Sequence, residues 1–356
     1  MIHGFIRPVC MFVLPVMAVL ILSACDSDDS PAGTPDRVKG FGISPRGFPL
    51  DYSNILEFYS EVAGMPDSAV MWNGAWRDDV AGGADAGEIP SPAAGTVRAA
   101  ETYGFTPILV FGWRSGETPY LKVPSNQVND WTNARARELF LTMLADAAGT
   151  LEPPFMFLGN ENDAYYEQAP EDYENWITFY NAAYDAVKDA SPHTLAGPVF
   201  NFEHMAGSGA LNGWTTHYWG ALESHDLSRV DIVGVTLYPW LNHRHARDVP
   251  LEYLDPPLER IGSKPVAITE TGWPAEDPGT VELPWESSEE QQVAYLSRLE
   301  EMLGEKNIKI VNWLFLYPMA NPGDDSLDWQ LFGSVSLRDF QAHKRPAYDR
   351  WLMFQP

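Results

Sequence analysis

The feature that most constrains the fold of this chain is a short apolar run that recurs eight times after Val38. The runs are rich in Val, Ile and Phe and are bounded by Gly, Pro or Asn, which is typical of strands buried in a parallel sheet. They occupy Gly40–Ser44, Ala69–Trp72, Pro107–Trp113, Pro154–Gly159, Thr194–Phe200, Val230–Tyr238, Pro265–Thr269 and Lys309–Tyr317.

Helical patterns fill the gaps between these runs. Apolar residues recur at helical spacing in Asp51–Ala63, Asp130–Ala148 and Glu171–Ala190. Ser287 followed by Glu290 fits a capping box at the start of a further helix.

The alternation of strand and helix determines the expected fold class. Eight strand–helix units predict an α/β fold, a (β/α)8 TIM barrel, over residues 38–356 as one domain. A doubly wound open sheet is the weaker alternative, because no glycine-rich phosphate loop follows the first run.

The start of the chain differs from the rest. Arg7 precedes a mostly apolar stretch, Val9–Leu22, which is short for a membrane span but suits the hydrophobic part of a signal peptide. The tetrapeptide Leu22-Ser23-Ala24-Cys25 resembles the lipobox of bacterial lipoproteins, which implies cleavage before Cys25 and lipidation of its sulfur. We therefore expect a signal peptide over residues 1–24, a flexible tether over 25–37, and a lipid anchor in a bacterial cell envelope.

Composition excludes several classes of function. Cys10 and Cys25 are the only cysteines, and both lie before the expected barrel, so a disulfide or a Cys-based site in the folded part is excluded. Lys plus Arg total 23 and Asp plus Glu total 49, which gives a formal net charge of -26. A chain this acidic repels polyanions, so we expect no nucleic-acid partner and no substrate such as pectate.

Two glutamates stand where predicted strands end. The fourth run leads into Asn160-Glu161, and the seventh leads into Glu270. In a (β/α)8 barrel the C-terminal ends of the strands form the active-site face. Two carboxylates across a cleft suit glycoside hydrolysis, in which one protonates the leaving oxygen and the other attacks or stabilises the anomeric carbon. Glu161 and Glu270 are therefore the candidate catalytic pair.

The surrounding motifs resemble those of the clan A glycoside hydrolases, which are retaining barrel enzymes. Gly159-Asn160-Glu161, Tyr238-Pro239-Trp240 and Thr269-Glu270-Thr271-Gly272-Trp273-Pro274 are similar to family 17, the β-1,3-glucanases. Glu270-Thr271-Gly272 followed by an aromatic residue and Pro is also similar to family 53, the β-1,4-galactanases. The resemblance implies that Glu161 is the acid/base, that Asn160 binds the sugar 2-hydroxyl and that Glu270 is the nucleophile.

The resemblance also implies roles for other residues at strand ends. In the clan, an aromatic residue or His at the position of Tyr238 hydrogen-bonds the nucleophile, and an indole at the position of Trp313 lies under the sugar. An indole face stacks on the C–H face of a pyranose. Trp176 and Trp351 lie on helical stripes and are expected in the core. The expected substrate-binding residues are Asn160, Tyr238, Trp313, Trp72, Asn73, Trp113 and Trp273.

Three other polar clusters give weaker signals. His243-Arg244-His245 has no evident third metal ligand, and the acidic residues Asp324, Asp325 and Asp328 lack EF-hand spacing. Glu203-His204, after the fifth run, either lines the cleft or caps a helix. We therefore expect no metal and no cofactor.

These observations support one main hypothesis and one alternative. The main hypothesis is a lipid-anchored retaining β-glycosidase that acts, in endo mode, on a neutral β-glucan or β-galactan. Its partners would be a polysaccharide or oligosaccharide and the membrane. The alternative is a non-catalytic, glycan-binding surface lipoprotein on the same barrel. The pair Glu161 and Glu270 argues against the alternative, because binding needs aromatic residues but not two aimed carboxylates.

Overall fold

The computed structural model describes residues 37–76, 87–113, 121–320 and 327–355, with the backbone alone for 327–329. The expected signal peptide and all of the expected tether except Arg37 lie outside these residues, as do Asp324, Asp325 and the side chain of Asp328. In the described part of the chain, no helix is long and apolar enough to cross a bilayer.

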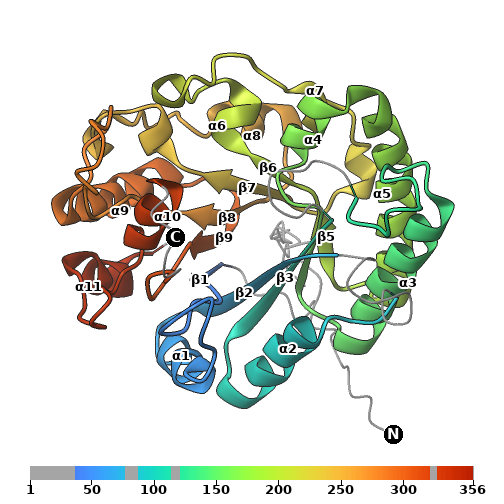
Figure 1. Ribbon diagram of the computed structural model, residues 1–356, viewed down its shortest axis with the longest axis horizontal. Coiled ribbons are helices and arrows are strands. Elements are labelled where there is room, and N and C mark those ends of the chain that lie inside the picture. The colour runs from blue at the N-terminus through green and yellow to red at the C-terminus, as the bar shows by residue number, and fades with distance from the viewer. Residues whose placement is uncertain (1–36, 77–86, 114–120, 321–326, 356) are drawn as a thin grey trace, which may run out of the picture. The chain divides into compact units, whose positions relative to one another are not determined.

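The strands form one parallel sheet that wraps into the predicted (β/α)8 barrel (Figure 1). Hydrogen-bonded neighbours follow the order β5-β4-β3-β2-β1-β9-β8-β7-β6. The strands are β1 Val38–Gly42, β2 Ser68–Ala75, β3 Thr106–Gly112, β4 Phe155–Leu158, β5 Leu195–Gly197, β6 Val199–Asn201, β7 Val233–Leu237, β8 Val266–Thr271 and β9 Ile308–Trp313.

The fifth predicted run supplies both ends of this order. β5 pairs with β4, β6 pairs with β7, and Pro198 stands between the two short strands. Proline has no N–H to donate to a ladder, so the run changes partners at this residue. Because β5 and β6 belong to one continuous segment, the segment completes the ring. The alternative of an open doubly wound sheet is therefore wrong.

The sheet separates two apolar cores. Every second residue along a strand points to the same face, and these residues fill the barrel interior with side chains such as Met71, Val110, Phe157 and Ile310. The larger core lies between the outer face of the sheet and the helices. Trp176 and Trp351 are fully buried in this larger core, as predicted.

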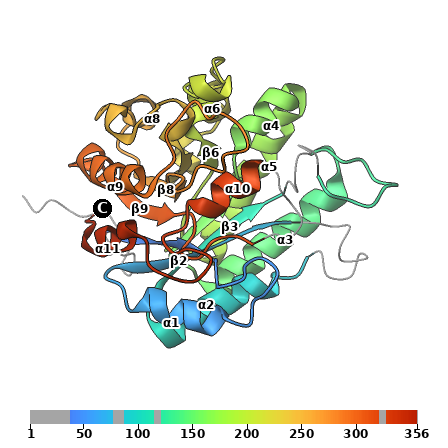
Figure 2. The ribbon, with the colours of Figure 1, turned by 60° about the vertical axis from the view of Figure 1, so that its left-hand side comes forward.

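Helices surround the sheet on its outer side (Figures 1 and 2). In the described residues the α-helices are α1 Ile55–Ala63, α2 Ser91–Tyr103, α3 Ala134–Leu151, α4 Asn162–Gln168, α5 Pro170–Ala190, α6 Phe202–Ala206, α7 Gly220–Glu223, α8 Asp255–Ile261, α9 Glu289–Leu303, α10 Leu327–Ser334 and α11 Pro346–Met353. Short 3-10 helices are η1 Ala210–Asn212, η2 Leu227–Arg229, η3 Pro239–Leu241 and η4 Ala246–Asp248.

Helix α9 begins one residue later than the capping-box pattern predicts. Ser288, not Ser287, is the N-cap, and its Oγ accepts a hydrogen bond from the backbone N–H of Gln291 at 3.2 Å. Ser288 and Gln291 have the same spacing as Ser287 and Glu290, and Gln also serves in a capping box. Two overlapping signals of equal quality therefore existed in the sequence, and the structure uses the second.

Candidate active site

Glu161 reaches the mouth of the barrel through a tight turn after β4. Gly159 has a left-handed φ of 84°, and a Cβ there would overlap the side chains of Asn162 and Trp113. Glu161 is itself left-handed, with φ 50° and ψ 54°, and it is the N-cap residue of α4. A non-glycine residue held in this region is strained, and such residues cluster at active sites.

Two donors hold the carboxyl group of Glu161. Asn201, the last residue of β6, donates from Nδ2 to Oε1 at 3.2 Å. Thr236, near the C-terminal end of β7, donates from Oγ1 to the same oxygen at 2.9 Å. Both donors therefore fix one oxygen of this carboxyl group.

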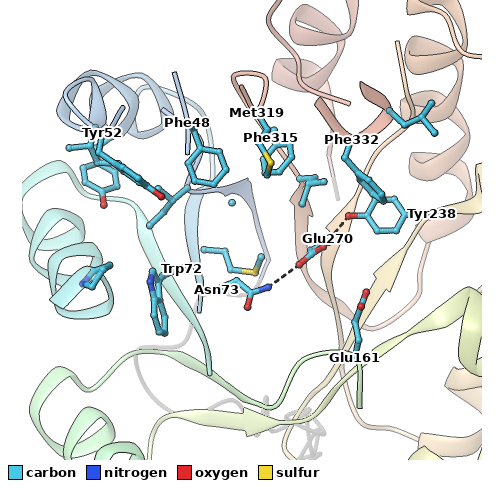
Figure 3. Close-up of a pocket in the computed structure, with 18 of the residues that line it drawn as sticks. Phe48, Tyr52, Trp72, Asn73, Glu161, Tyr238, Glu270, Phe315, Met319 and Phe332 are labelled. Carbon is cyan, nitrogen blue, oxygen red and sulfur yellow. Dashed lines mark hydrogen bonds between the residues drawn. The ribbon is translucent and has the colours of Figure 1, made fainter. Parts of the chain in front are cut away.

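Glu270 lies on β8, and its carboxyl group also has two donors (Figure 3). Asn73 Nδ2 donates to Oε1 and the Tyr238 hydroxyl donates to Oε2, each at 3.0 Å. The pairing of β7 with β8 shifts register between Val235 and Thr236, immediately beside Glu270. Bulges of this kind re-aim a side chain near active sites. The contact of Tyr238 with Glu270 is the one that the clan resemblance implies.

The two glutamates are electrostatically coupled. Burial, and then the negative charge of Glu161, raises the pKa of Glu270 to about 7, against the hydrogen bonds from Tyr238 and Asn73. Two neighbouring carboxylates in the wall of one cavity do not both ionise readily, so the pair tends to retain one proton near neutral pH. One protonated acid beside one carboxylate is the state that acid-assisted nucleophilic attack requires.

A cavity of about 1460 Å³ opens around this pair. Five of the expected residues, Trp72, Asn73, Glu161, Tyr238 and Glu270, lie in its wall (Figure 3). Trp72 is only 9% exposed. Most of the wall is apolar and aromatic, which is the usual composition of a site that binds a small molecule or an oligosaccharide.

Three expected sugar platforms are core residues instead. Trp113, Trp273 and Trp313 are completely buried and are absent from the cavity wall. Trp113 packs on Trp176 with ring centroids 3.9 Å apart. The indole N–H groups of Trp273 and Trp313 each donate to a backbone carbonyl at 2.8 Å. The prediction that these three residues bind substrate is therefore corrected, because their indole faces are occupied by protein.

Asn160 is placed less directly than the resemblance implies. It is half-buried beside Glu161 but is not part of the cavity wall. Its Oδ1 is buried and has no hydrogen-bond partner in the described part of the chain. Its binding to a sugar 2-hydroxyl stays a prediction.

Glu203 and His204, after the fifth predicted run, neither line the cleft nor cap a helix. Glu203 and His204 lie on α6, directly behind Asn201, and neither lines the cavity. The N-cap of α6 is Asn201, so neither residue is the cap. The alternation of inward and outward side chains along each strand could have identified Asn201 and Thr236 as facing the mouth. Asn and Thr are common residues, however, and nothing in the sequence shows that these two contact Glu161.

Glu203 is a completely buried acid. Its Oε1 accepts a hydrogen bond from the Tyr253 hydroxyl at 3.2 Å. Burial raises the pKa of Glu203 to about 8, although the backbone amides of Tyr238 and of Glu203 itself favour the ionised form. The negative charge of Glu161 adds to the upward shift. A pKa of about 8 favours the neutral form of Glu203 at pH 7, near the carboxyl group of Glu161.

The possible metal site at His243–His245 is not assembled. His245 Nδ1 pairs with Glu286 at 3.0 Å. Among the residues that the structure describes, no group of three or more His, Cys, Asp or Glu side chains could hold a metal ion.

Comparisons with known proteins identify the fold. No model of a protein family matches this chain, and no curated protein matches it. Among solved structures, an exo-β-1,4-mannosidase from Opitutaceae bacterium strain TAV5 superposes with a TM-score of 0.66 at 15% identity, over 91% of this chain and 60% of that chain. A family 39 glycoside hydrolase from Bacteroides cellulosilyticus gives 0.59 at 19% identity, over 90% of this chain and 64% of that chain.

A fungal β-1,4-galactanase matches over most of both chains. Its TM-score is 0.59 at 16% identity, over 88% of this chain and 98% of that chain. This chain spans only about 60% of the length of the mannosidase and 64% of the family 39 enzyme. At these identities the comparisons establish the barrel fold, which this chain shares with glycoside hydrolases.

The buried acid gives a prediction about stability. A neutral Glu203 stabilises the folded state fully below its unfolded pKa, near 4.5, and this contribution is lost as the pH rises through about 8. Gln at this position keeps the shape and cannot ionise. Between pH 4.5 and 8.5, we expect the Glu203→Gln variant to gain about 4 kcal/mol in unfolding free energy relative to the wild type. Urea unfolding at both pH values measures this difference.

The exposed Glu259 on α8 provides the matched control. The difference in unfolding free energy between Glu259→Gln and the wild type should change little with pH. A Glu203→Gln difference that is equally flat would show that Glu203 is ionised in the folded protein.

Proposed function

We propose that this protein is a retaining β-glycosidase. The proposal rests on one observation above the others: Glu161 and Glu270 share a cavity, each fixed by two donors, and the charge of one raises the pKa of the other. The arrangement supplies an acid and a nucleophile at the same place. The barrel shared with mannosidase and galactanase structures supports the same chemistry.

The reaction follows from the two roles. Ionised Glu270 attacks the anomeric carbon, and the C–O bond to the leaving group breaks while Glu161 gives its proton to the departing oxygen. The glycosyl ester on Glu270 is then hydrolysed by water, whose proton returns to Glu161. Tyr238 and Asn73 hold Glu270 in place. Retention calls for a separation of about 5–5.5 Å between the two carboxyl groups.

A neutral β-linked polysaccharide fits this cavity best. Arg98, on α2, is the single cationic side chain among the described residues of the wall. A site for an acidic sugar needs a positively charged partner for each carboxylate, and the net charge of -26 works against such a substrate. The volume of about 1460 Å³ exceeds that of a usual small-ligand pocket, which supports an oligosaccharide and internal cleavage of a β-glucan or β-galactan.

The roles of the two glutamates are separable by azide rescue. Glu161→Ala should lose several orders of magnitude on substrates with poor leaving groups and much less on an activated aryl β-glycoside. Azide should restore turnover and give a β-configured glycosyl azide, because it attacks the intermediate on Glu270. Glu270→Ala should fail on both substrate classes, since the covalent route is gone.

Product analysis on β-glucans, β-galactan and β-mannan identifies the polymer. Binding to one of these polymers without release of reducing sugar would instead support the non-catalytic glycan-binding alternative. A β-configured azide product from Glu270→Ala, with an α-configured one from Glu161→Ala, would reverse the two roles.

The coupling between the glutamates predicts a pH effect. The pair holds one proton near neutral pH, and its first proton leaves while Glu161 is still neutral. With an activated aryl glycoside, the acid limb of kcat/KM should therefore stay near its wild-type position in Glu161→Gln. The second proton leaves from beside a charged carboxylate, so the alkaline limb of kcat/KM should disappear in Glu161→Gln and stay in place in Glu259→Gln. An alkaline limb that survives in Glu161→Gln would contradict the charge coupling.

We also propose that the protein is a lipoprotein anchored in a bacterial envelope through Cys25. The support is the sequence Leu22-Ser23-Ala24-Cys25 and the polar stretch that follows it. The Cys25→Ser variant should lose the lipid and leave the membrane fraction, because the proposed acyl groups are its anchor. Fractionation of cells at high salt checks this. Continued sedimentation of the variant with membranes would refute the anchor.

A further inference from the structure

Asn201 uses three polar groups at once at the end of β6. Its backbone N–H donates to Asp163 Oδ1 at 2.7 Å, and its Oδ1 accepts from the backbone N–H of His204 at 3.1 Å. The remaining group, Nδ2, donates to Glu161 Oε1 at 3.2 Å. Because Oδ1 is engaged as an acceptor, the amide cannot flip without breaking this bond, so the N–H group is the end that faces Glu161.

A buried ion pair stands behind Asn201. The second oxygen of Asp163 contacts His204 Nδ1 at 2.6 Å, and Asp163 is completely buried. His204 Nε2 contacts Glu167 Oε2 at 3.1 Å. The His204 ring also stacks on Tyr218, at 4.8 Å between centroids, and meets the edge of Trp214.

Charge on His204 completes this arrangement. Burial alone would lower the pKa of His204, but Asp163 and Glu167 outweigh burial and raise it. Tyr218, the remaining titratable group in contact with the ring, donates its hydroxyl to Glu167. Asp163 and Glu167 thus favour the protonated form of His204, and the ring gives the buried Asp163 side chain a hydrogen-bond partner inside the fold.

We propose that Asn201 is a positioning residue for the acid/base Glu161, and that the Asp163–His204 pair holds Asn201 in that role. The inference rests on the proposed function for its kinetic consequence but not for its geometry. Asn201 and Thr236 both donate to Oε1, which fixes the orientation of the Glu161 carboxyl group. The leaving oxygen of the substrate then meets an acid held in a defined orientation.

The direct test removes the N–H donor that Asn201 presents to Glu161 and keeps the oxygen that caps α6. In Asn201→Asp, a carboxylate oxygen can still accept from His204 N–H, but a negative charge replaces the N–H that faces Glu161. We expect roughly a 10- to 100-fold loss of kcat on a phenyl β-glycoside, and only about a 3-fold loss on a dinitrophenyl β-glycoside, which needs little acid assistance. The alkaline limb of the plot of kcat against pH for the phenyl glycoside should move to higher pH, because the added negative charge disfavours ionisation of Glu161.

Asn307 supplies the matched control. It precedes β9 at the opposite end of the barrel, and its Nδ2 donates to Ser263 O at 3.1 Å. Asn307→Asp makes the same chemical change far from the mouth, so both glycosides should be cleaved at the wild-type rate. If Asn201→Asp does not fold, Asn201→Ser removes the amide without adding charge and should show the same dependence on leaving group.

A double-mutant cycle tests the role of the ion pair. His204→Gln removes the positive charge while leaving an amide that can donate to Asp163. The loss of kcat that His204→Gln causes on the phenyl glycoside should largely vanish when Asn201→Ser is already present, because both changes act through the Asn201 side chain. Additive losses would overturn the assignment of His204. Equal losses on both glycosides in Asn201→Asp would overturn the assignment of Asn201.

A measurement that does not depend on catalysis separates this inference from the proposed function. The carboxyl resonance of Glu161 in protein labelled with carbon-13 glutamate is identified by its absence in Glu161→Gln. Its titration midpoint should move to higher pH in Asn201→Asp and stay unchanged in Asn307→Asp. An unmoved midpoint in Asn201→Asp contradicts the inference. A moved midpoint in a protein that cleaves no glycoside supports the positioning and refutes the proposed function.

Discussion

Wrapping of the parallel sheet into a ring is the constraint on which the site depends. A parallel barrel brings the C-terminal ends of all its strands to one mouth. Asn73 and Glu270 are 197 residues apart in the chain, yet they share a hydrogen bond across that mouth. The ring is completed at Pro198, where one short segment passes from a ladder with β4 to a ladder with β7. The same segment ends in Asn201, so the completion of the ring also delivers a donor to Glu161.

Buried charge is the second organising theme of the mouth. Glu203 and Asp163 are completely buried, whereas Glu270 is half-buried in the cavity wall, and the three acids have different surroundings. Glu270 has two donors and a like charge nearby, which leaves its proton balanced near neutrality. Glu203 has weaker support and remains neutral at pH 7. Asp163 has two hydrogen-bond partners, the His204 ring and the backbone N–H of Asn201. The three environments lie at the C-terminal ends of β4, β6 and β8.

The sequence predicted the barrel and the placement of both glutamates because each depends on local pattern. The spacing of apolar residues predicts the strands, and the end of each predicted strand predicts which residues lie at the mouth of the barrel. It failed for Trp113, Trp273 and Trp313, since a strand end does not tell whether a side chain turns into the cavity or into the layer beneath the helices. Register shifts beside Glu270 alter that direction locally, and no pattern in the chain marks them. Asn201 was missed for another reason: its importance lies in a contact with a residue on a different strand.

The left-handed backbone of Glu161 sets stability against function at this one position. Glycine occupies that conformation without the steric penalty that glutamate carries there, so selection for folding alone would favour loss of the carboxyl group. Glu161 therefore carries a backbone strain that a glycine at this turn would relieve. Under the proposed function, a change from Glu161 to glycine would remove the proposed acid/base and relax the fold at once, so activity would be lost most easily at this turn.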